Sequence, residues 1–200
     1  MLVGQTGSGK TTLARALLAH RRQVVVLDAK GMIRWKDYRI YREFGKLLKA
    51  DPRKEPRLIY KPSFQELQDF DLLNRFFVWV YQRRHCTCYV DELMGVTRGE
   101  VYPEYMGGCL TRGRELDIEL WTATQRPLRI PQVAMSEAEH TYAFKLKMPQ
   151  DRRRVYDLTG IDETRIAALA KRQFLYSRQD GETQGPLTLD LGAVPTIRGE

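Results

Sequence analysis

One short segment near the N-terminus constrains the fold of this chain more than any other. Residues 4–11 read G-Q-T-G-S-G-K-T and fit the pattern G-x-x-x-x-G-K-[ST]. The glycines of this pattern let backbone N–H groups turn inward around phosphate oxygens, and the following helix adds the positive end of its dipole. Such a loop needs a strand before it and a helix after it. Residues 2–3 and 10–20 have the composition expected of both.

The side chains of this segment have distinct expected roles. Lys10 would reach the β- and γ-phosphates as a point charge, and the Thr11 hydroxyl would coordinate Mg²⁺. The sequence therefore predicts ATP and Mg²⁺ as cofactors. The residues expected to contact the nucleotide are Gly4, Gln5, Thr6, Gly7, Ser8, Gly9, Lys10, Thr11 and Thr12.

A second polar sequence follows the apolar residues 86–90. In a sheet that carries a phosphate-binding loop, Asp91 at the end of this strand would hold Mg²⁺, and Glu92 would activate the attacking water. The alternative is an ordinary loop that begins with Asp-Glu. A glutamate at position 92 also distinguishes between classes of P-loop protein. Kinases and many GTPases lack a catalytic glutamate at this place, whereas hydrolytic motor ATPases have one.

Gln125 ends the next apolar segment, and two arginines precede that segment. The carboxyl ends of neighbouring strands converge on the ligand crevice of a doubly wound sheet, so Gln125 is expected to sense the γ-phosphate or to position water. Arg112 and Arg114 suit the stabilisation of a transferring phosphoryl group, which an arginine of another subunit can provide. The alternatives are a surface glutamine before a proline turn and two ordinary surface arginines.

The apolar runs alternate with helical patterns, which predicts an α/β domain with a mostly parallel central sheet and a C-terminal β-hairpin. The expected strands are 2–3, 24–27, 58–60, 86–90, 118–124 and 142–146, with a hairpin of 174–177 and 186–189 around Asp180-Gly181. The expected helices are 10–20, 41–49, 63–84 (with Ser63 and Glu66 as a capping box), 103–116, 150–158 and 162–171. Residues 1–190 are expected to form one P-loop ATPase domain with a basic insertion at 31–61, and residues 191–200 a loose tail or docking arm.

Composition excludes several classes of protein. The longest apolar run, 76–81, is six residues, far short of the roughly 20 that a membrane-spanning helix needs. We find no signal peptide, and three cysteines with two of them two residues apart predict neither a disulfide framework nor a zinc site. We therefore expect a reduced, cytoplasmic protein with no membrane span.

The basic charge of the chain is confined to one stretch. Residues 21–61 hold 13 basic and 5 acidic residues, an excess of 8 that equals the net charge of +8 of the whole chain. Clustered positive charge is typical of a protein that binds a polyanion, and the alternative is a solvated basic face. The candidate DNA contacts are Arg34, Lys36, Arg39 and Arg42 in this stretch and Arg98 in the loop 97–105.

Together these segments resemble the FtsK–HerA superfamily of P-loop ATPases, and among them the genome-packaging ATPases of tailless, membrane-containing viruses and related phage ATPases. The resemblance spans roughly residues 1–178. The segments that carry it are 4–11, Asp28-Ala29-Lys30-Gly31, Asp91-Glu92, Gly113-Arg114 and W-T-A-T-Q-R-P at 121–127.

The resemblance implies a RecA-like fold of the ASCE class, a ring that is usually a hexamer, and ATP-driven movement of double-stranded DNA through its pore. It matches the trans-acting arginine of the family to Arg114, with Arg112 second, and the polar sensor to Gln125. The expected partners are further copies of the chain, double-stranded DNA, and a capsid or portal-vertex protein. The expected location is the host cytoplasm or the virion.

Two other functions remain open at this stage. An ATPase motor that acts on protein, in phage assembly or secretion, would use the same hydrolytic site without a DNA-facing basic surface. A small-molecule kinase would need an arginine-rich lid, which Arg152-Arg153-Arg154 could mimic, but it would lack the catalytic glutamate. DNA-stimulated ATPase activity distinguishes a translocase from both.

Overall fold

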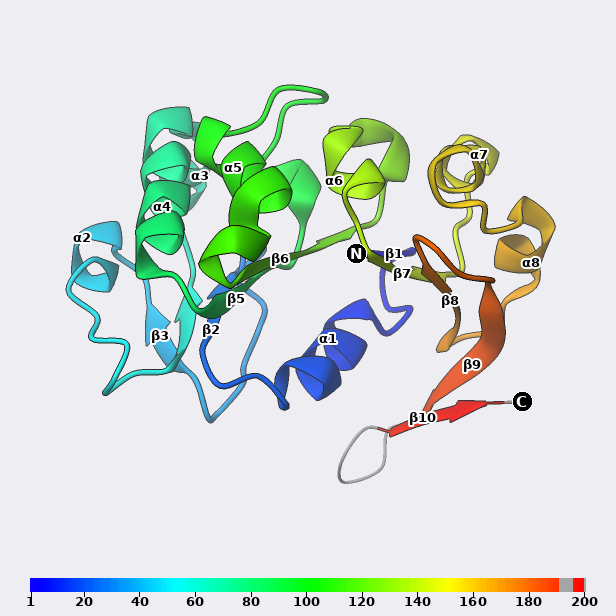
Figure 1. The fold of residues 1–200 in the computed structure, drawn as a ribbon, viewed down its shortest axis with the longest axis horizontal. Coiled ribbons are helices and arrows are strands. Elements are labelled where there is room, and N and C mark those ends of the chain that lie inside the picture. Colours follow the sequence, from blue (N-terminus) through cyan, green and yellow to red (C-terminus); the bar gives the residue numbers. More distant parts are fainter. Residues whose placement is uncertain (191–195, 200) are drawn as a thin grey trace. The chain divides into compact units, whose positions relative to one another are not determined.

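Strands and helices alternate along most of the chain and form an α/β fold, as the sequence predicts (Figure 1). The computed structural model describes residues 1–190 and 196–199. It comprises two compact units: the terminal unit, made of Met1–Ala19 and the chain from Ala123 onward, and the middle unit, His20–Thr122. Each unit is described by itself below.

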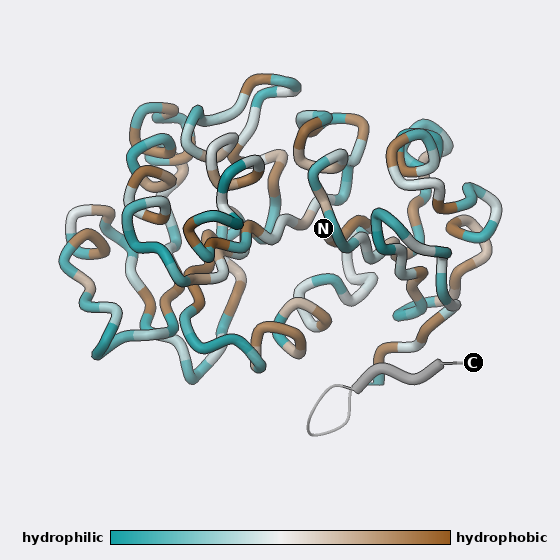
Figure 2. Tube along the Cα trace, in the orientation of Figure 1, coloured by the Kyte–Doolittle hydropathy of each residue, from teal (hydrophilic) through white to brown (hydrophobic). Residues whose placement is uncertain are grey.

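The strands of the middle unit are parallel and follow the order β3-β4-β2-β5, with residues 118–122 of β6 beside β5. Their bounds are β2 (Val24–Leu27), β3 (Arg39–Tyr41), β4 (Arg57–Tyr60), β5 (Cys86–Val90) and β6 (Ile118–Thr124). Every residue of β2 and β5 is buried, which explains why both read as continuous apolar runs. Figure 2 shows the hydrophobic stretch along β2 between hydrophilic loops.

The helices of the middle unit differ from the sequence expectation in one place. They are α2 (Phe44–Leu47), α3 (Phe64–Gln68), α4 (Phe70–Arg83) and α5 (Glu104–Arg112). The single helix predicted over 63–84 is wrong, because Asp69 has an extended backbone and its side chain caps α4 by accepting from the Leu72 N–H. The capping box of Ser63 and Glu66 is confirmed at the start of α3.

The basic stretch 31–61 contains one strand that the sequence does not predict and a shorter helix than expected. The expected helix over 41–49 is a single turn, α2, and the preceding residues form the short strand β3, which pairs with β4. Strand β3 is only three residues long, and Arg39 and Ile40 are both exposed, so the sequence shows no alternation of polar and apolar residues there. Only the pairing with β4 defines this strand.

Two glycines inside α5 weaken the sequence prediction of a helix, yet the helix forms. A Cβ at Gly107 would lie 2.8 Å from the ring of Tyr102, so this position is small because an aromatic ring packs against it. Figure 1 shows α5 beside α4 over the strands of the middle unit. Close packing thus outweighs the poor helix propensity of glycine.

The terminal unit combines parallel and antiparallel pairing. Strand β1 (Leu2–Val3) pairs in parallel with the last two residues of β6 on one side and with β7 on the other. Strands β7, β8, β9 and β10 then follow in antiparallel order, and β8 and β9 confirm the predicted C-terminal hairpin. The remaining bounds are β7 (His140–Phe144), β8 (Gln173–Arg178), β9 (Gln184–Asp190), β10 (Thr196–Gly199), α1 (Lys10–Leu18), α6 (Val133–Ser136), α7 (Pro149–Thr159) and α8 (Glu163–Ala168).

The predicted tail at 191–200 is covered only in part. Residues 196–199 form β10 against β9, and the rest of that segment lies outside the described residues. In the part of the chain that the structure describes, no helix combines the length and the apolar character needed to cross a bilayer.

Candidate functional site

The glycine-rich loop joins β1 to α1 in the terminal unit, and its backbone requires glycine. Gly7 and Gly9 have positive φ angles of 73° and 115°, which side chains rarely tolerate. Gly4 has a φ of 155°, and a Cβ there would lie 2.6 Å from the Cβ of Phe144. The glycine spacing of the motif is therefore set by the turn itself and by the close approach of β7.

Two neighbouring strands fasten this loop. The Gly4 N–H donates to the Thr124 carbonyl at 3.2 Å, and the Gln5 N–H donates to the Lys145 carbonyl at 3.0 Å. The Thr6 hydroxyl donates to Oε1 of Gln125 at 2.5 Å. The structure thus brings the Gln125 side chain to the loop.

Lys10 and Ser8 present polar groups within the loop. Lys10 is buried, and its Nζ donates to the carbonyls of Gly4 at 2.6 Å and Gln5 at 3.1 Å. The Ser8 hydroxyl is also buried, and it has no hydrogen-bond partner within the described residues. A buried hydroxyl without a partner is costly, so this loop is built to complete its hydrogen bonds with a ligand.

Asp91 and Glu92 directly follow β5 in the middle unit, and both side chains are buried. The Tyr89 hydroxyl donates to Oδ1 of Asp91 at 2.7 Å, which orients this carboxylate. Oε2 of Glu92 forms an ion pair at 2.7 Å with Nζ of Lys30. Sequence reasoning included Lys30 in the resemblance but assigned it no role.

A buried ion pair explains how Lys30 is held. Asp28, at the end of β2, is fully buried and accepts from the backbone N–H groups of Met32 at 3.2 Å and Ile33 at 2.8 Å. Nζ of Lys61, which follows β4, lies 3.4 Å from Oδ2 of Asp28 and also donates to the Gly31 and Ile33 carbonyls. Burial lowers the pKa of Lys61, and the Asp28 carboxylate opposes that change. The ion pair and these hydrogen bonds hold the conformation of the loop 28–33, which carries Lys30.

We predict that Lys61→Met destabilises the middle unit by about 3–5 kcal/mol, because it leaves the Asp28 carboxylate buried without its cation. Urea unfolding followed by tryptophan fluorescence measures this, since all three tryptophans lie in the middle unit. The matched control is Lys46→Met, which breaks an exposed ion pair with Glu43 and should cost at most about 1 kcal/mol. Equal effects of the two variants would contradict the prediction.

The two arginines expected to act on a neighbouring subunit are both exposed at the end of α5 and in the turn after it. In the described part of the chain, neither Arg112 nor Arg114 makes a side-chain hydrogen bond or ion pair. Between them, a Cβ at Gly113 would lie 2.6 Å from the Ile118 carbonyl oxygen, so glycine lets this turn approach β6 closely. Both guanidinium groups are thus available for an external anion.

The candidate DNA contacts fall into two groups. Arg34 donates to the carbonyls of Gly31 and Ile33, and Arg98 donates to the Gln68 carbonyl at 2.8 Å and lies over the ring of Phe70. These two side chains hold their own loops in shape. The exposed residues with no such backbone anchor are Lys36, Arg39 and Arg42.

A further ion pair, which sequence reasoning missed, lies in the terminal unit. Nε of Arg126 is 2.8 Å from Oδ2 of Asp151, a residue of α7 that is almost fully buried. Oδ1 of Asp151 accepts from the Leu128 N–H at 3.0 Å. Asp151 therefore holds the segment directly after Gln125 in place. No local sequence pattern indicates this ion pair, because Arg126 and Asp151 are 25 residues apart.

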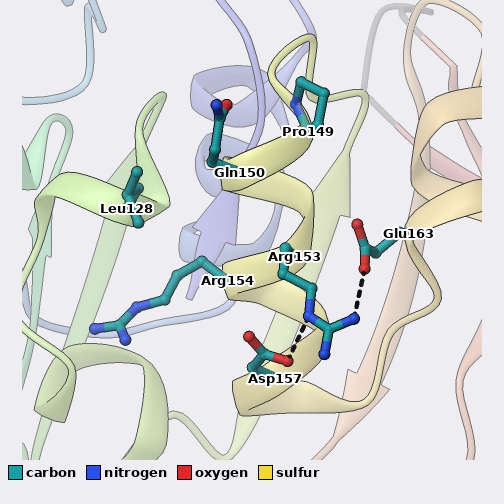
Figure 3. A pocket seen from close by; sticks show the side chains of 7 residues that line it. All are labelled: Leu128, Pro149, Gln150, Arg153, Arg154, Asp157 and Glu163. Carbon is teal, nitrogen blue, oxygen red and sulfur yellow. Dashed lines mark hydrogen bonds and ion pairs between the residues drawn. The ribbon is translucent and has the colours of Figure 1, made fainter.

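A cavity of about 580 Å³ in the terminal unit does not suit a phosphate (Figure 3). Its main cation, Arg153, pairs with Asp157 at 3.0 Å and with Glu163 at 3.4 Å, while Arg154 points away from this cluster (Figure 3). The charge is balanced internally, so this cavity is not the predicted lid of a kinase site.

The residues predicted to hold Mg²⁺ offer suitable donors. The Thr11 hydroxyl and the Asp91 carboxylate are hard oxygen ligands, and Mg²⁺ commonly takes only one or two carboxylates together with substrate phosphates. No cluster of three or more His, Cys, Asp or Glu side chains suited to a metal occurs within the described residues. Each of these two oxygens, Thr11 in the terminal unit and Asp91 in the middle unit, is by its own chemistry a suitable ligand for Mg²⁺.

Comparison with known proteins establishes the fold. No protein-family model and no curated protein matches the sequence. Among solved structures, the genome-packaging NTPase B204 of Sulfolobus turreted icosahedral virus 2, in complex with AMPPCP, is similar with a TM-score of 0.72 and 14% identity, covering 92% of this chain and 93% of that chain. A bacterial conjugative coupling protein, TrwBdeltaN70, gives a TM-score of 0.61 and 10% identity, covering 91% of this chain and 82% of that chain. The predicted P-loop NTPase fold is confirmed.

Proposed function

From the fold that this chain shares with a genome-packaging NTPase and a conjugative coupling protein, we propose that it is an ATP-hydrolysing motor that moves double-stranded DNA. It would act as a subunit of a ring, with six copies as the proposed number, in viral genome packaging. The observation that carries the proposal is the buried Glu92 carboxylate directly after Asp91 at the end of β5, in a fold whose β1–α1 connection is a phosphate-binding loop.

The glycine-rich loop supplies binding energy in the proposed mechanism. Its backbone N–H groups, the first turn of α1 and the Ser8 hydroxyl would hold the phosphate chain of ATP. The Lys10 ammonium would exchange its contacts with the Gly4 and Gln5 carbonyls for phosphate oxygens, which carry full negative charge. Bound Mg²⁺, held by Thr11 and Asp91, would neutralise charge on the phosphates.

Three side chains would act on the chemical step. Glu92 would accept the proton of the attacking water, and its ion pair with Lys30 orients the carboxylate. Gln125, held by the Thr6 hydroxyl, would position that water or sense the γ-phosphate. Arg114 would stabilise the transferring phosphoryl group of a neighbouring subunit, because its side chain is exposed and makes no hydrogen bond or ion pair among the described residues.

The exposed basic residues of the middle unit support DNA as the moving substrate. Lys36, Arg39 and Arg42 lie within ten residues of one another, and β3, which carries Arg39, pairs only with β4 in the described chain. Positive side chains at such an edge are suited to phosphates of any sequence. A capsid or portal-vertex protein with an acidic surface is a further proposed partner for the same residues.

DNA-stimulated ATP hydrolysis tests the proposed function. We predict that double-stranded DNA raises the turnover of the assembled protein, and that the logarithm of DNA affinity falls linearly with the logarithm of salt concentration. The double variant Lys36→Glu/Arg39→Glu should flatten this slope by roughly two units and remove the stimulation, with basal hydrolysis unchanged.

The matched control is Lys49→Glu/Lys54→Glu, which changes the charge of the same unit by the same amount outside the proposed contacts. An unchanged salt slope in the Lys36→Glu/Arg39→Glu variant would move the DNA path to the loop 97–105. An assembled ring that hydrolyses ATP but binds no DNA would favour a motor that acts on protein.

A further inference from the structure

A second cavity of the terminal unit opens directly onto the phosphate-binding loop. Its volume is about 420 Å³, and Gln5, Thr6, Gly7 and Ser8 form one side of it. Lys145, Ala170 and Lys171 also line it. Two of its seven lining residues are lysines and none is acidic, so the cavity carries net positive charge independently of Lys10.

The fold brings these two lysines to the loop from distant parts of the sequence. Lys145 follows β7, whose parallel pairing with β1 ends beside the loop, and its carbonyl accepts from the Gln5 N–H at 3.0 Å. Strand β8 is antiparallel to β7, so the turn before β8 lies at the same end of the sheet as the residue that follows β7. Lys171 lies in that turn, which the Gln173 side chain closes by accepting from the Ala170 N–H at 2.9 Å.

The unpartnered Ser8 hydroxyl points to a ligand in this cavity. It is 5% exposed, lines the cavity, and finds no hydrogen-bond partner among the residues that the structure describes. Two lysines beside a glycine-rich loop that also holds an unsatisfied hydroxyl suit an anion with several oxygens, which is the chemistry of a phosphate chain.

We propose that Lys145 and Lys171 are binding residues for the phosphate chain of the nucleotide, on the side of the loop formed by β7 and the 170–173 turn. The inference rests on the proposed function, since it assigns additional residues to the same nucleotide site. Their charge selects for nucleotides with a long phosphate chain, because each added phosphate adds negative charge in reach of the two ammonium groups.

Titration of nucleotide affinity tests this proposal. Lys145→Gln and Lys171→Gln should each weaken the binding of ATP and of inorganic tripolyphosphate about fivefold, as expected for loss of one charge contact at a solvated site, and together about twentyfold. AMP binding should change less than about twofold, since AMP carries the least charge. Lys147→Gln, an exposed lysine that does not line the cavity, is the matched control and should bind all three ligands like the wild type.

Arginine variants separate charge from folding. The double variant Lys145→Arg/Lys171→Arg keeps both positive charges and should retain ATP affinity within about threefold. Wild-type affinity for ATP and tripolyphosphate in the double glutamine variant would overturn the assignment of the two lysines and leave the proposed function standing. A wild-type protein that binds neither ATP nor tripolyphosphate would instead overturn the proposed function together with this inference.

Discussion

Glu92→Gln should lower ATP turnover by at least about 100-fold while ATP binding is retained. The amide has the shape of the carboxylate but does not accept the proton of the attacking water. The ion pair with Lys30 is also lost, but the Lys30 side chain is 36% exposed and stays solvated, so the fold should survive. Phosphate release at saturating ATP measures turnover, and titration with a fluorescent ATP analogue measures binding.

The control for this experiment is Glu137→Gln, which neutralises an exposed glutamate after α6 and should turn over ATP like the wild type. Near-normal turnover of the Glu92→Gln protein would show that the base assignment is wrong. Lys30→Met tests the orienting contact separately. The Lys30→Met variant keeps the Glu92 carboxylate, so we expect it to lose much less turnover than the Glu92→Gln variant.

Arg114→Ala should reduce hydrolysis by about 10³–10⁵-fold, the usual effect of removing an arginine that stabilises a transferring phosphoryl group from a neighbouring subunit. The altered subunit should bind ATP normally, because the side chain of Arg114 is exposed and makes no hydrogen bond or ion pair with its own chain among the described residues. Mixed with wild-type subunits, it should poison the ring, so activity should fall more steeply than the fraction of altered subunits.

Two further variants sharpen this test. Arg112→Ala removes the second candidate, and Arg129→Ala, an exposed arginine after β6, is the control that should keep full activity. If Arg112→Ala has the larger effect, the assignment moves to Arg112, two residues earlier in the chain. Full hydrolysis by a dilute and demonstrably monomeric sample would show that no arginine is needed from another subunit.

The local chemistry of the candidate site could be predicted from the sequence. The glycine-rich turn can be recognised from the sequence because the positive φ angles at positions 7 and 9 favour glycine. The buried strands β2 and β5 are visible as largely apolar runs, since strands covered on both faces have few polar positions. Segments with weaker local signals could not be predicted in this way. The sequence did not predict the strand β3, and it predicted one continuous helix where the structure has a break at Asp69.

The sequence by itself determined the glycine-rich loop, the carboxylates after β5 and the α/β order of the elements, because each depends on residues close together in the chain. Only the tertiary structure decided which side chains meet across the fold. Lys30 with Glu92, Asp28 with Lys61, and Arg126 with Asp151 are pairs of this kind. Lys145 and Lys171 reach the loop because strand pairing carries them there. The physical reason is that an ion pair or a cavity depends on distance in space, and sequence spacing sets that distance only within one element.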